Sequence, residues 1–161
     1  MSKNVLVREF MVTQVVTLSP DMDICSAMRL LLHHHISGAP VVDAEHRVVG
    51  ILSEKDCLRV FANEAYFQEA VARVSDYMSR KVVTVGPEDE LFHVAGLLLE
   101  HTFRRLPVVE GGKLVGQVSR HDVLMASLKL CKEAPVKPPF SDAKYLTDEV
   151  KAALAQPLPT E

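Results

Sequence analysis

Two patterns of hydrophobic residues alternate along most of the 161-residue chain. A short β-branched run at Val15–Thr17 stops at a proline, which predicts a strand followed by a turn. From Ile24 onward the apolar residues recur at intervals of three and four, as on one face of a helix, and an aspartate precedes them as a candidate cap. The apolar runs at 40–42 and 48–52 then predict two strands joined by a turn.

The same order of patterns occurs twice. Residues 11–43 match residues 78–110 at a constant offset of 67 positions, with 12 identities in 33 aligned pairs, and residues 50–56 match residues 116–122 after a shift of one position. An internal repeat of this length indicates two copies of one structural unit. We therefore predict an α/β fold class in which each copy runs strand, helix, strand, strand, helix, with small sheets packed against helices.

The repeats and the prolines set the predicted boundaries. The first copy covers residues 1–64 and the second covers 74–132, with a connecting helix at 65–73, where apolar residues recur helically. Residues 133–161 are rich in proline, which excludes long regular structure, and within them only 148–156 has a helical pattern. Two interpretations of this extension stay open: a mobile tail, or a docking arm that uses its apolar side chains.

Composition and charge narrow the class of protein. Charged residues make up 24% of the chain and the formal net charge is −3, which is far from the basic balance of a general nucleic-acid binder. The three cysteines are odd in number and form no Cys-x-x-Cys pair, which favours a reducing cytoplasm. No stretch approaches the length of a membrane-spanning apolar segment. We therefore expect a cytoplasmic protein with neither a membrane nor a nucleic-acid partner.

Signature motifs of catalysis are missing from the sequence, and we expect no enzymatic activity, no metal and no cofactor. The glycine pair at 111–112 lacks the helix and the hydroxyl residue of a phosphate-binding loop, so it predicts a hairpin turn. His33–His35 are consecutive and would point in different directions from a helix, so they do not converge on one metal ion. A solvated helix end is the favoured interpretation of these histidines.

One motif whose side chains could bind a ligand occurs twice: Gly-x-x-Ser-x-x-Asp at 50–56 and 116–122. Ser53 and Ser119 stand where a helix needs its N-cap, and the aspartate three residues later lies on the same face of that helix. A carboxylate there can accept two hydrogen bonds from a cis-diol such as ribose. The alternative is capping alone, in which the aspartate stabilises the helix end by about 1 kcal/mol.

The residues of both copies resemble cystathionine β-synthase (CBS) motifs, namely VVTLSPDMDICSAMRLLLHHHISGAPVVD with RVVGILSEKD, and VVTVGPEDELFHVAGLLLEHTFRRLPVVEGGKLVGQVSRHD. Over residues 5–130 the tandem resembles a Bateman module. The resemblance implies two pseudo-symmetric halves, two clefts between them, and binding of an adenosine ligand such as AMP, ADP, ATP or S-adenosylmethionine without catalysis.

The resemblance also implies roles for individual residues. It places the ribose hydroxyls on Asp56 and Asp122, and ribose or phosphate oxygens on Ser53 and Ser119. The backbone that brackets the adenine would come from the first strands and from the segments around the proline of the next strand: Val15, Thr17, Val82, Thr84, Gly38, Ala39, Pro40, Arg105, Leu106 and Pro107.

The two copies differ in charge at these positions. Basic side chains gather on the second copy, whereas the first has Ser37 and Gly38 in place of two of them: His101, Arg104, Arg105, Arg120 and His121. Arginine suits bidentate contact with phosphate, and a paired surface charge is the alternative. We predict two sites of unequal affinity, with Asp122 in the cleft that draws on Arg104 or Arg105. Which copy's arginines face which copy's aspartate stays open.

The sequence therefore predicts a regulatory module that binds an adenosine nucleotide as its ligand and signals the bound state to an effector protein. We expect a homodimer, because two thin layers would leave part of the four amphipathic helices exposed. The alternatives are a structural dimerisation module without ligand response, and a sensor of S-adenosylmethionine or an NAD-type ligand.

Overall fold

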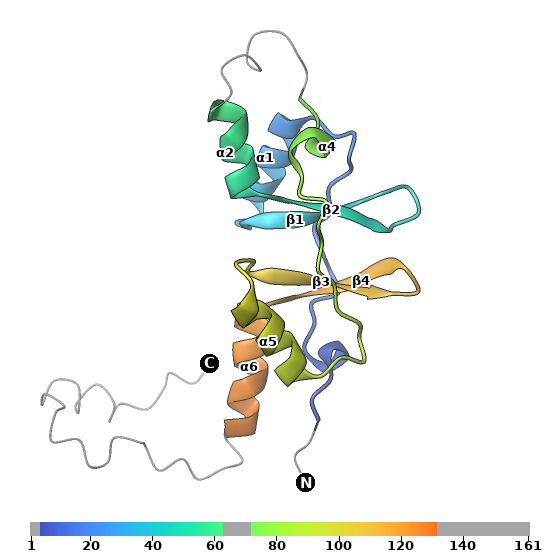
Figure 1. Cartoon of the computed structure of the whole chain (residues 1–161), viewed down its shortest axis with the longest axis vertical. Helices are drawn as coiled ribbons and strands as arrows, with labels where there is room; N and C mark the ends of the chain where they lie inside the picture. Colours follow the sequence, from blue (N-terminus) through green and yellow to red (C-terminus); the bar gives the residue numbers. More distant parts are fainter. Residues whose placement is uncertain (1–3, 63–71, 132–161) are drawn as a thin grey trace, which may run out of the picture. The chain divides into compact units, whose positions relative to one another are not determined.

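A computed structural model describes residues 4–62 and 72–131 of the chain (Figure 1). The helix predicted at 65–73 lies largely outside the described residues, and the predicted extension at 133–161 lies wholly outside them. Residues 1–127 form one compact unit, which holds nearly all of both repeats.

The first repeat consists of a hairpin of two strands with two helices on one side of it (Figure 1). Its elements are α1 (Ile24–His33), β1 (Gly38–Val42), β2 (Val48–Ser53) and α2 (Glu54–Ala62). The strands pair antiparallel, with a bulge between Val41 and Val42. Asp23 caps α1, as its carboxylate accepts the backbone N–H of Ser26 at 2.9 Å. The predicted helix and both predicted strands are confirmed.

The second repeat has the same arrangement. Its elements are α5 (Leu91–Glu100), β3 (Arg105–Glu110), β4 (Lys113–Ser119) and α6 (Arg120–Cys131). Glu110 pairs with Lys113 across the turn, and Gly111 and Gly112 have φ angles of 56° and 81°. Only glycine adopts two such left-handed conformations in succession at no steric cost, so the predicted hairpin turn is confirmed.

The short strands predicted at 15–17 and 82–84 are not formed. In each repeat this stretch makes one parallel bridge to the following strand, at Leu18 in the first repeat and at Val85 in the second. A proline follows two residues after each bridge, and its missing N–H prevents the pairing from continuing. The β-branched residues therefore favour extended backbone without building a third strand.

The segments that begin the two repeats are exchanged: each one pairs with the hairpin of the other repeat. They contain the 3-10 helix η1 (Val7–Glu9) and the helix α4 (Val74–Tyr77). Val12 forms an antiparallel bridge with Gln117 of β4, so the N-terminal segment completes the second repeat. Ser79 forms the matching bridge with Ile51 of β2, so the segment after the first repeat returns to complete it. The two repeats are thus tied into one unit by backbone pairing.

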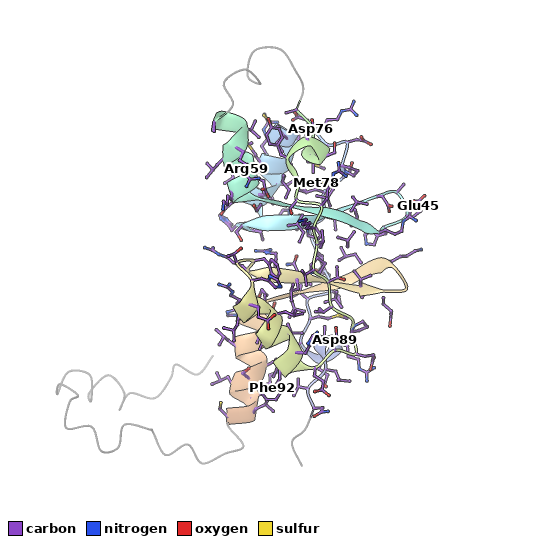
Figure 2. All side chains as sticks on the ribbon, viewed as in Figure 1. Glu45, Arg59, Asp76, Met78, Asp89 and Phe92 are labelled. Atoms are coloured by element: carbon purple, nitrogen blue, oxygen red, sulfur yellow. The ribbon has the colours of Figure 1, made fainter. Side chains whose placement is uncertain are left out.

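A glycine in each repeat makes room for the exchanged segment. A Cβ on Gly50 would lie 2.9 Å from Cγ of Met78, which sits beside β2 on the stretch after α4 (Figure 2). A Cβ on Gly116 would lie 2.9 Å from Sδ of Met11 in the N-terminal segment. Both contacts are shorter than real carbon contacts, so the glycine of each repeated motif is needed for close approach of the crossing chain.

The amphipathic helices bury one face and leave another partly uncovered. The core of the first repeat gathers apolar side chains from α1, α2, both strands, the stretch before α1 and the returning segment around α4: Leu18, Ile24, Ala27, Leu31, Ala39, Val41, Leu52, Cys57, Val60, Ala72, Val74 and Met78. Large apolar side chains are exposed on all four long helices: Leu32, Leu58, Phe92, Leu99, Leu124 and Met125. Within the described ranges, no helix has the length and hydropathy needed to cross a membrane.

Candidate functional site

A cavity of about 410 Å³ is lined by residues of both repeats. The first repeat contributes residues of the Gly-x-x-Ser-x-x-Asp motif and of the start of β1: Ser37, Gly38, Ile51, Ser53, Glu54, Lys55 and Asp56. The second repeat contributes the returning segment, the loop before β3 and the first residue of β3: Ser79, Lys81, Thr102, Phe103, Arg104 and Arg105. A volume of this size lies within the range of cavities that hold small ligands.

Asp56 is the one charged side chain that the fold buries among the described residues, with 8% of its surface exposed. Its Oδ2 accepts the backbone N–H of Ser53 at 2.9 Å and the hydroxyl of Ser53 at 2.6 Å, and Oγ of Ser53 lies 3.3 Å from the backbone N of Asp56. This reciprocal arrangement confirms Ser53 as the N-cap of α2.

The second carboxylate oxygen of Asp56 keeps acceptor capacity. Its Oδ1 lies 3.6 Å from Nη1 of Arg59, whose side chain is 64% exposed, so this ion pair is weak. An ionised carboxylate offers about four lone-pair sites, and capping uses two of them at Oδ2. Capping and ribose binding by Asp56 are therefore compatible, because the cap holds the carboxylate in place while Oδ1 keeps lone pairs for a new donor.

Asp122 forms the same capping arrangement in the second repeat. Its Oδ2 accepts the backbone N–H of Ser119 at 2.7 Å and the Ser119 hydroxyl at 2.6 Å. Asp122 is half-buried and is not among the residues that line the cavity. The cavity that both Arg104 and Arg105 line contains Asp56 instead. Arg104 and Arg105 of the second repeat thus share a cavity with the aspartate of the first, while the charge of Asp122 also acts on Arg105.

The cavity is locally positive in a chain whose net charge is −3. Its lining carries four cationic side chains and two carboxylates: Lys55, Lys81, Arg104, Arg105, Glu54 and Asp56. Charges that line a cleft of low dielectric focus the local field. This cavity therefore favours an anionic ligand.

Arg105 is the most constrained cation of the group. Its Nη2 donates a hydrogen bond to Oγ of Ser37 at 3.2 Å, so it crosses from the second repeat to the first. Burial lowers the pKa of Arg105, while the negative charges of Asp122 and Glu54 oppose this change and Arg104 reinforces it. A guanidinium stays protonated despite such a shift. Arg105 therefore contributes a permanent charge to the wall of the cavity.

Cys57, next to Asp56 in the chain, is a packing residue. Burial raises the pKa of the Cys57 thiol to about 11, and the neighbouring charge of Asp56 acts in the same direction. The thiol stays protonated at neutral pH and is a poor nucleophile. Cys57 accordingly packs in the core of the first repeat.

The structure brings together only some of the predicted site residues. Five line the cavity: Gly38, Ser53, Asp56, Arg104 and Arg105. The others are not part of its lining: Val15, Thr17, Ala39, Pro40, Val82, Thr84, Leu106, Pro107, Ser119, Arg120, His121 and Asp122. Thr17 lies in a separate depression beside the turn between β1 and β2.

Arg120 and His101 have partners outside the cavity. The Nη2 of Arg120 donates to the carbonyl oxygens of Leu98 and His101 at 3.2 and 3.3 Å, so it satisfies carbonyls at the C-terminal end of α5. The ring of His101 stacks on Phe103, with centroids 4.6 Å apart and an angle of 22° between the planes. Through this stack His101 supports Phe103, which does line the cavity.

The lining also contains residues that sequence reasoning missed: Ser37, Ile51, Glu54, Lys55, Ser79, Lys81, Thr102 and Phe103. Ile51, Glu54 and Lys55 lie within the repeated Gly-x-x-Ser-x-x-Asp motif, so their positions next to Ser53 and Asp56 could have identified them as lining residues. Ser79 and Lys81 reach the cavity through the exchange of segments, which no local pattern reveals.

The consecutive histidines end α1. The helix stops at His33, His34 is its C-cap, and His35 has a φ of 52°. All three side chains are exposed, in agreement with the solvated helix end favoured from the sequence. Among residues 4–62 and 72–131, no group of three or more histidine, cysteine or acidic side chains is placed to hold a metal ion.

Comparison with known proteins gives consistent matches. The family model of the CBS domain matches residues 7–63 and again 74–129. Protein MJ1225 of Methanocaldococcus jannaschii is 34% identical over 118 residues, which are 73% of this chain and 41% of that protein, so the chain spans less than half of that relative.

Solved structures agree with this match. The crystal structure of CBSX2, a CBS-pair protein from Arabidopsis thaliana, in complex with AMP has a TM-score of 0.71 and 32% identity, and the match covers 78% of this chain and 98% of that one. The CBS domain pair of MJ0100 in complex with 5′-methylthioadenosine and S-adenosyl-L-methionine has a TM-score of 0.67 and 25% identity, over 80% and 98% of the chains.

Proposed function

Because the chain belongs to the CBS domain family and carries two CBS domains in tandem, we propose that it is a regulatory module that binds an adenosine nucleotide in the Asp56 cavity. The observation that carries the proposal is the presence, in one cavity, of a capped carboxylate from the first repeat and two arginines from the second. The complexes of CBSX2 with AMP and of MJ0100 with S-adenosyl-L-methionine support an adenosine ligand.

The ribose would bind at the start of α2. The Oδ1 of Asp56 accepts the hydroxyls of the cis-diol, while the hydrogen bonds from Ser53 to Oδ2 keep the carboxylate from rotating. A side chain that is already held in its bound orientation loses little conformational entropy when the ligand arrives. The capping hydrogen bonds thus serve binding as well as helix stability.

The phosphate and the base would occupy different parts of the lining. Arg104 is exposed at the cavity, and its guanidinium can contact phosphate oxygens in a bidentate manner. Ile51 and Phe103 offer apolar surface for a purine, and the stack of His101 behind Phe103 limits the movement of that ring. Gly38 leaves its part of the wall without a side chain.

The charge of the cavity distinguishes between adenosine ligands. AMP, ADP and ATP carry negative phosphates, which the four cations of the lining attract. S-adenosylmethionine carries a positive sulfonium, which the same cations repel. We therefore propose AMP, ADP or ATP as the ligand class and place S-adenosylmethionine second.

Thermal unfolding tests this function. A ligand that binds only the folded state at a hundredfold excess over its Kd stabilises that state by about 2.7 kcal/mol, which corresponds to a rise in Tm of about 5–10 °C for a chain of this size. We expect this rise with AMP or ADP, and smaller rises with GMP and S-adenosylmethionine at equal concentration. Equal rises with GMP, or none with any adenosine compound, would contradict the proposal and favour a dimerisation module without ligand response.

We also propose that the chain is a homodimer that transmits its bound state to an effector protein. Exposed apolar side chains lie on α1, α2, α5 and α6, and closed two-fold association is the commonest way to cover such faces. Light scattering should give about twice the chain mass of 17.8 kDa at micromolar concentration.

A substitution on one helix tests where the dimer forms. Leu99 is 86% exposed on α5, and Leu99→Lys should shift the scattering mass toward that of one chain, because it places a charge in the apolar contact. Val12 is 45% exposed but lies outside these helices, so Val12→Lys is the matched control and should leave the dimer intact. A monomeric parent protein would refute the dimer.

A further inference from the structure

The internal alignment makes Gly38 of the first repeat equivalent to Arg105 of the second. Gly38 begins β1 and pairs with Ser53, whereas Arg105 begins β3 and pairs with Ser119. Each of these two residues therefore lies directly opposite the serine of its own Gly-x-x-Ser-x-x-Asp motif. Beside the serine, the first repeat has no side chain, and the second has the longest cationic side chain available.

The direction of a side chain at this position follows from the glycine. A Cβ built on Gly38 would lie 2.9 Å from the carbonyl oxygen of Leu52, 3.2 Å from Cα of Ser53 and 3.5 Å from its Cβ. A side chain here would thus start against the backbone of Leu52 and the capping serine, and Gly38, which has no side chain, lines the Asp56 cavity. By the repeat symmetry, the stem of Arg105 starts in the space of the second repeat that corresponds to this cavity.

From there the side chain of Arg105 reaches across to the first repeat, where its guanidinium meets Ser37 at the wall of the Asp56 cavity. Arg105 is half-buried, and its Nη2 donates to Oγ of Ser37 at 3.2 Å. The charge of Asp122 is the strongest influence that favours its protonated form, ahead of Glu54. Arg105 thus has a hydrogen-bond partner in the first repeat and a charge partner in the second.

We propose that the stem of Arg105 fills the second cleft beside Asp122, so that each chain binds one nucleotide, in the Asp56 cavity. This inference rests on the proposed function and specifies its stoichiometry. A ribose at Asp122 would have to displace the stem of Arg105 and break its hydrogen bond to Ser37, leaving a half-buried cation without that partner. Gly38 imposes no such cost at Asp56.

Calorimetric titration of the full chain with AMP tests the stoichiometry. The parent should bind one equivalent per chain. Arg105→Gly gives the second repeat the glycine of the first and should bind two equivalents, the one at Asp56 more weakly than in the parent because Arg105 also lines that cavity. The double variant Arg105→Gly/Asp122→Ala should return to one equivalent. Arg104→Gly removes a neighbouring arginine without clearing the cleft, so it should still bind one equivalent, at least threefold more weakly.

The outcomes separate this inference from the proposed function. Two equivalents for the parent would overturn the inference, as would one equivalent for an Arg105→Gly variant that melts like the parent. If Arg105→Gly does not fold, Arg105→Ser, which also removes the long stem, decides in its place. Absence of AMP binding by both the parent and the arginine variants would overturn the proposed function, and the inference with it.

Discussion

Asp56→Ala should weaken the binding of AMP at least tenfold, whereas Asp122→Ala should leave the affinity unchanged. Hydrogen bonds to a charged group contribute about 1.5–3 kcal/mol, and 1.4 kcal/mol corresponds to a factor of ten in the dissociation constant. Asp56 is buried at the cavity with a free acceptor at Oδ1, while Asp122 is outside the lining. Calorimetric titration of both variants beside the parent measures the difference.

The two substitutions form a matched pair because both remove the same capping hydrogen bonds. The Oδ2 of each aspartate accepts the backbone N–H and the hydroxyl of the serine three residues earlier. We expect each variant to lose about 1 kcal/mol of folding stability. If capping were the only role of Asp56, both variants would melt lower and both would bind AMP as the parent does. A tenfold loss for Asp122→Ala alone would restore the assignment that the sequence favoured.

Gly50→Ala and Gly116→Ala should each lower the free energy of unfolding by about 1–3 kcal/mol, the usual cost of an added group in a packed site. Met78 is a flexible neighbour of Gly50 and can move aside. The added Cβ would also lie 3.0 Å from the carbonyl oxygen of Ser79, which accepts the backbone N–H of Ile51 at 2.9 Å. That backbone cannot move away without weakening the bridge that closes the first repeat.

Denaturant unfolding measures this effect, and Gly96 supplies the control. A Cβ on Gly96, inside α5, meets no atom within 4 Å. Gly96→Ala should therefore raise the stability by up to about 1 kcal/mol, because alanine has the higher helix propensity. We also expect one unfolding transition for the parent, since the exchanged segments tie the repeats together. Stability equal to that of the parent for both Gly50→Ala and Gly116→Ala would show that the crossing segments are not closely packed.

The local elements could be predicted from the sequence because their causes are local. The helix at α1 follows from apolar spacing and from Asp23, and the β3–β4 turn follows from two adjacent glycines. The capping of α2 by Ser53 and Asp56 involves residues three apart, so the motif itself contains the geometry. The internal repeat then determined that each of these elements occurs twice.

The composition of the site was decided by tertiary structure. Asp56 and Arg104 meet in one cavity although they belong to different repeats, and Lys81 reaches it because the returning segment pairs with β2. Sequence periodicity reports which face of an element is buried but not which distant element covers it. Asp122 could not be separated from Asp56 by sequence, since both belong to the same motif. Their surroundings differ across the strand pairing, where Gly38 lies opposite the serine of the first motif and Arg105 lies opposite the serine of the second.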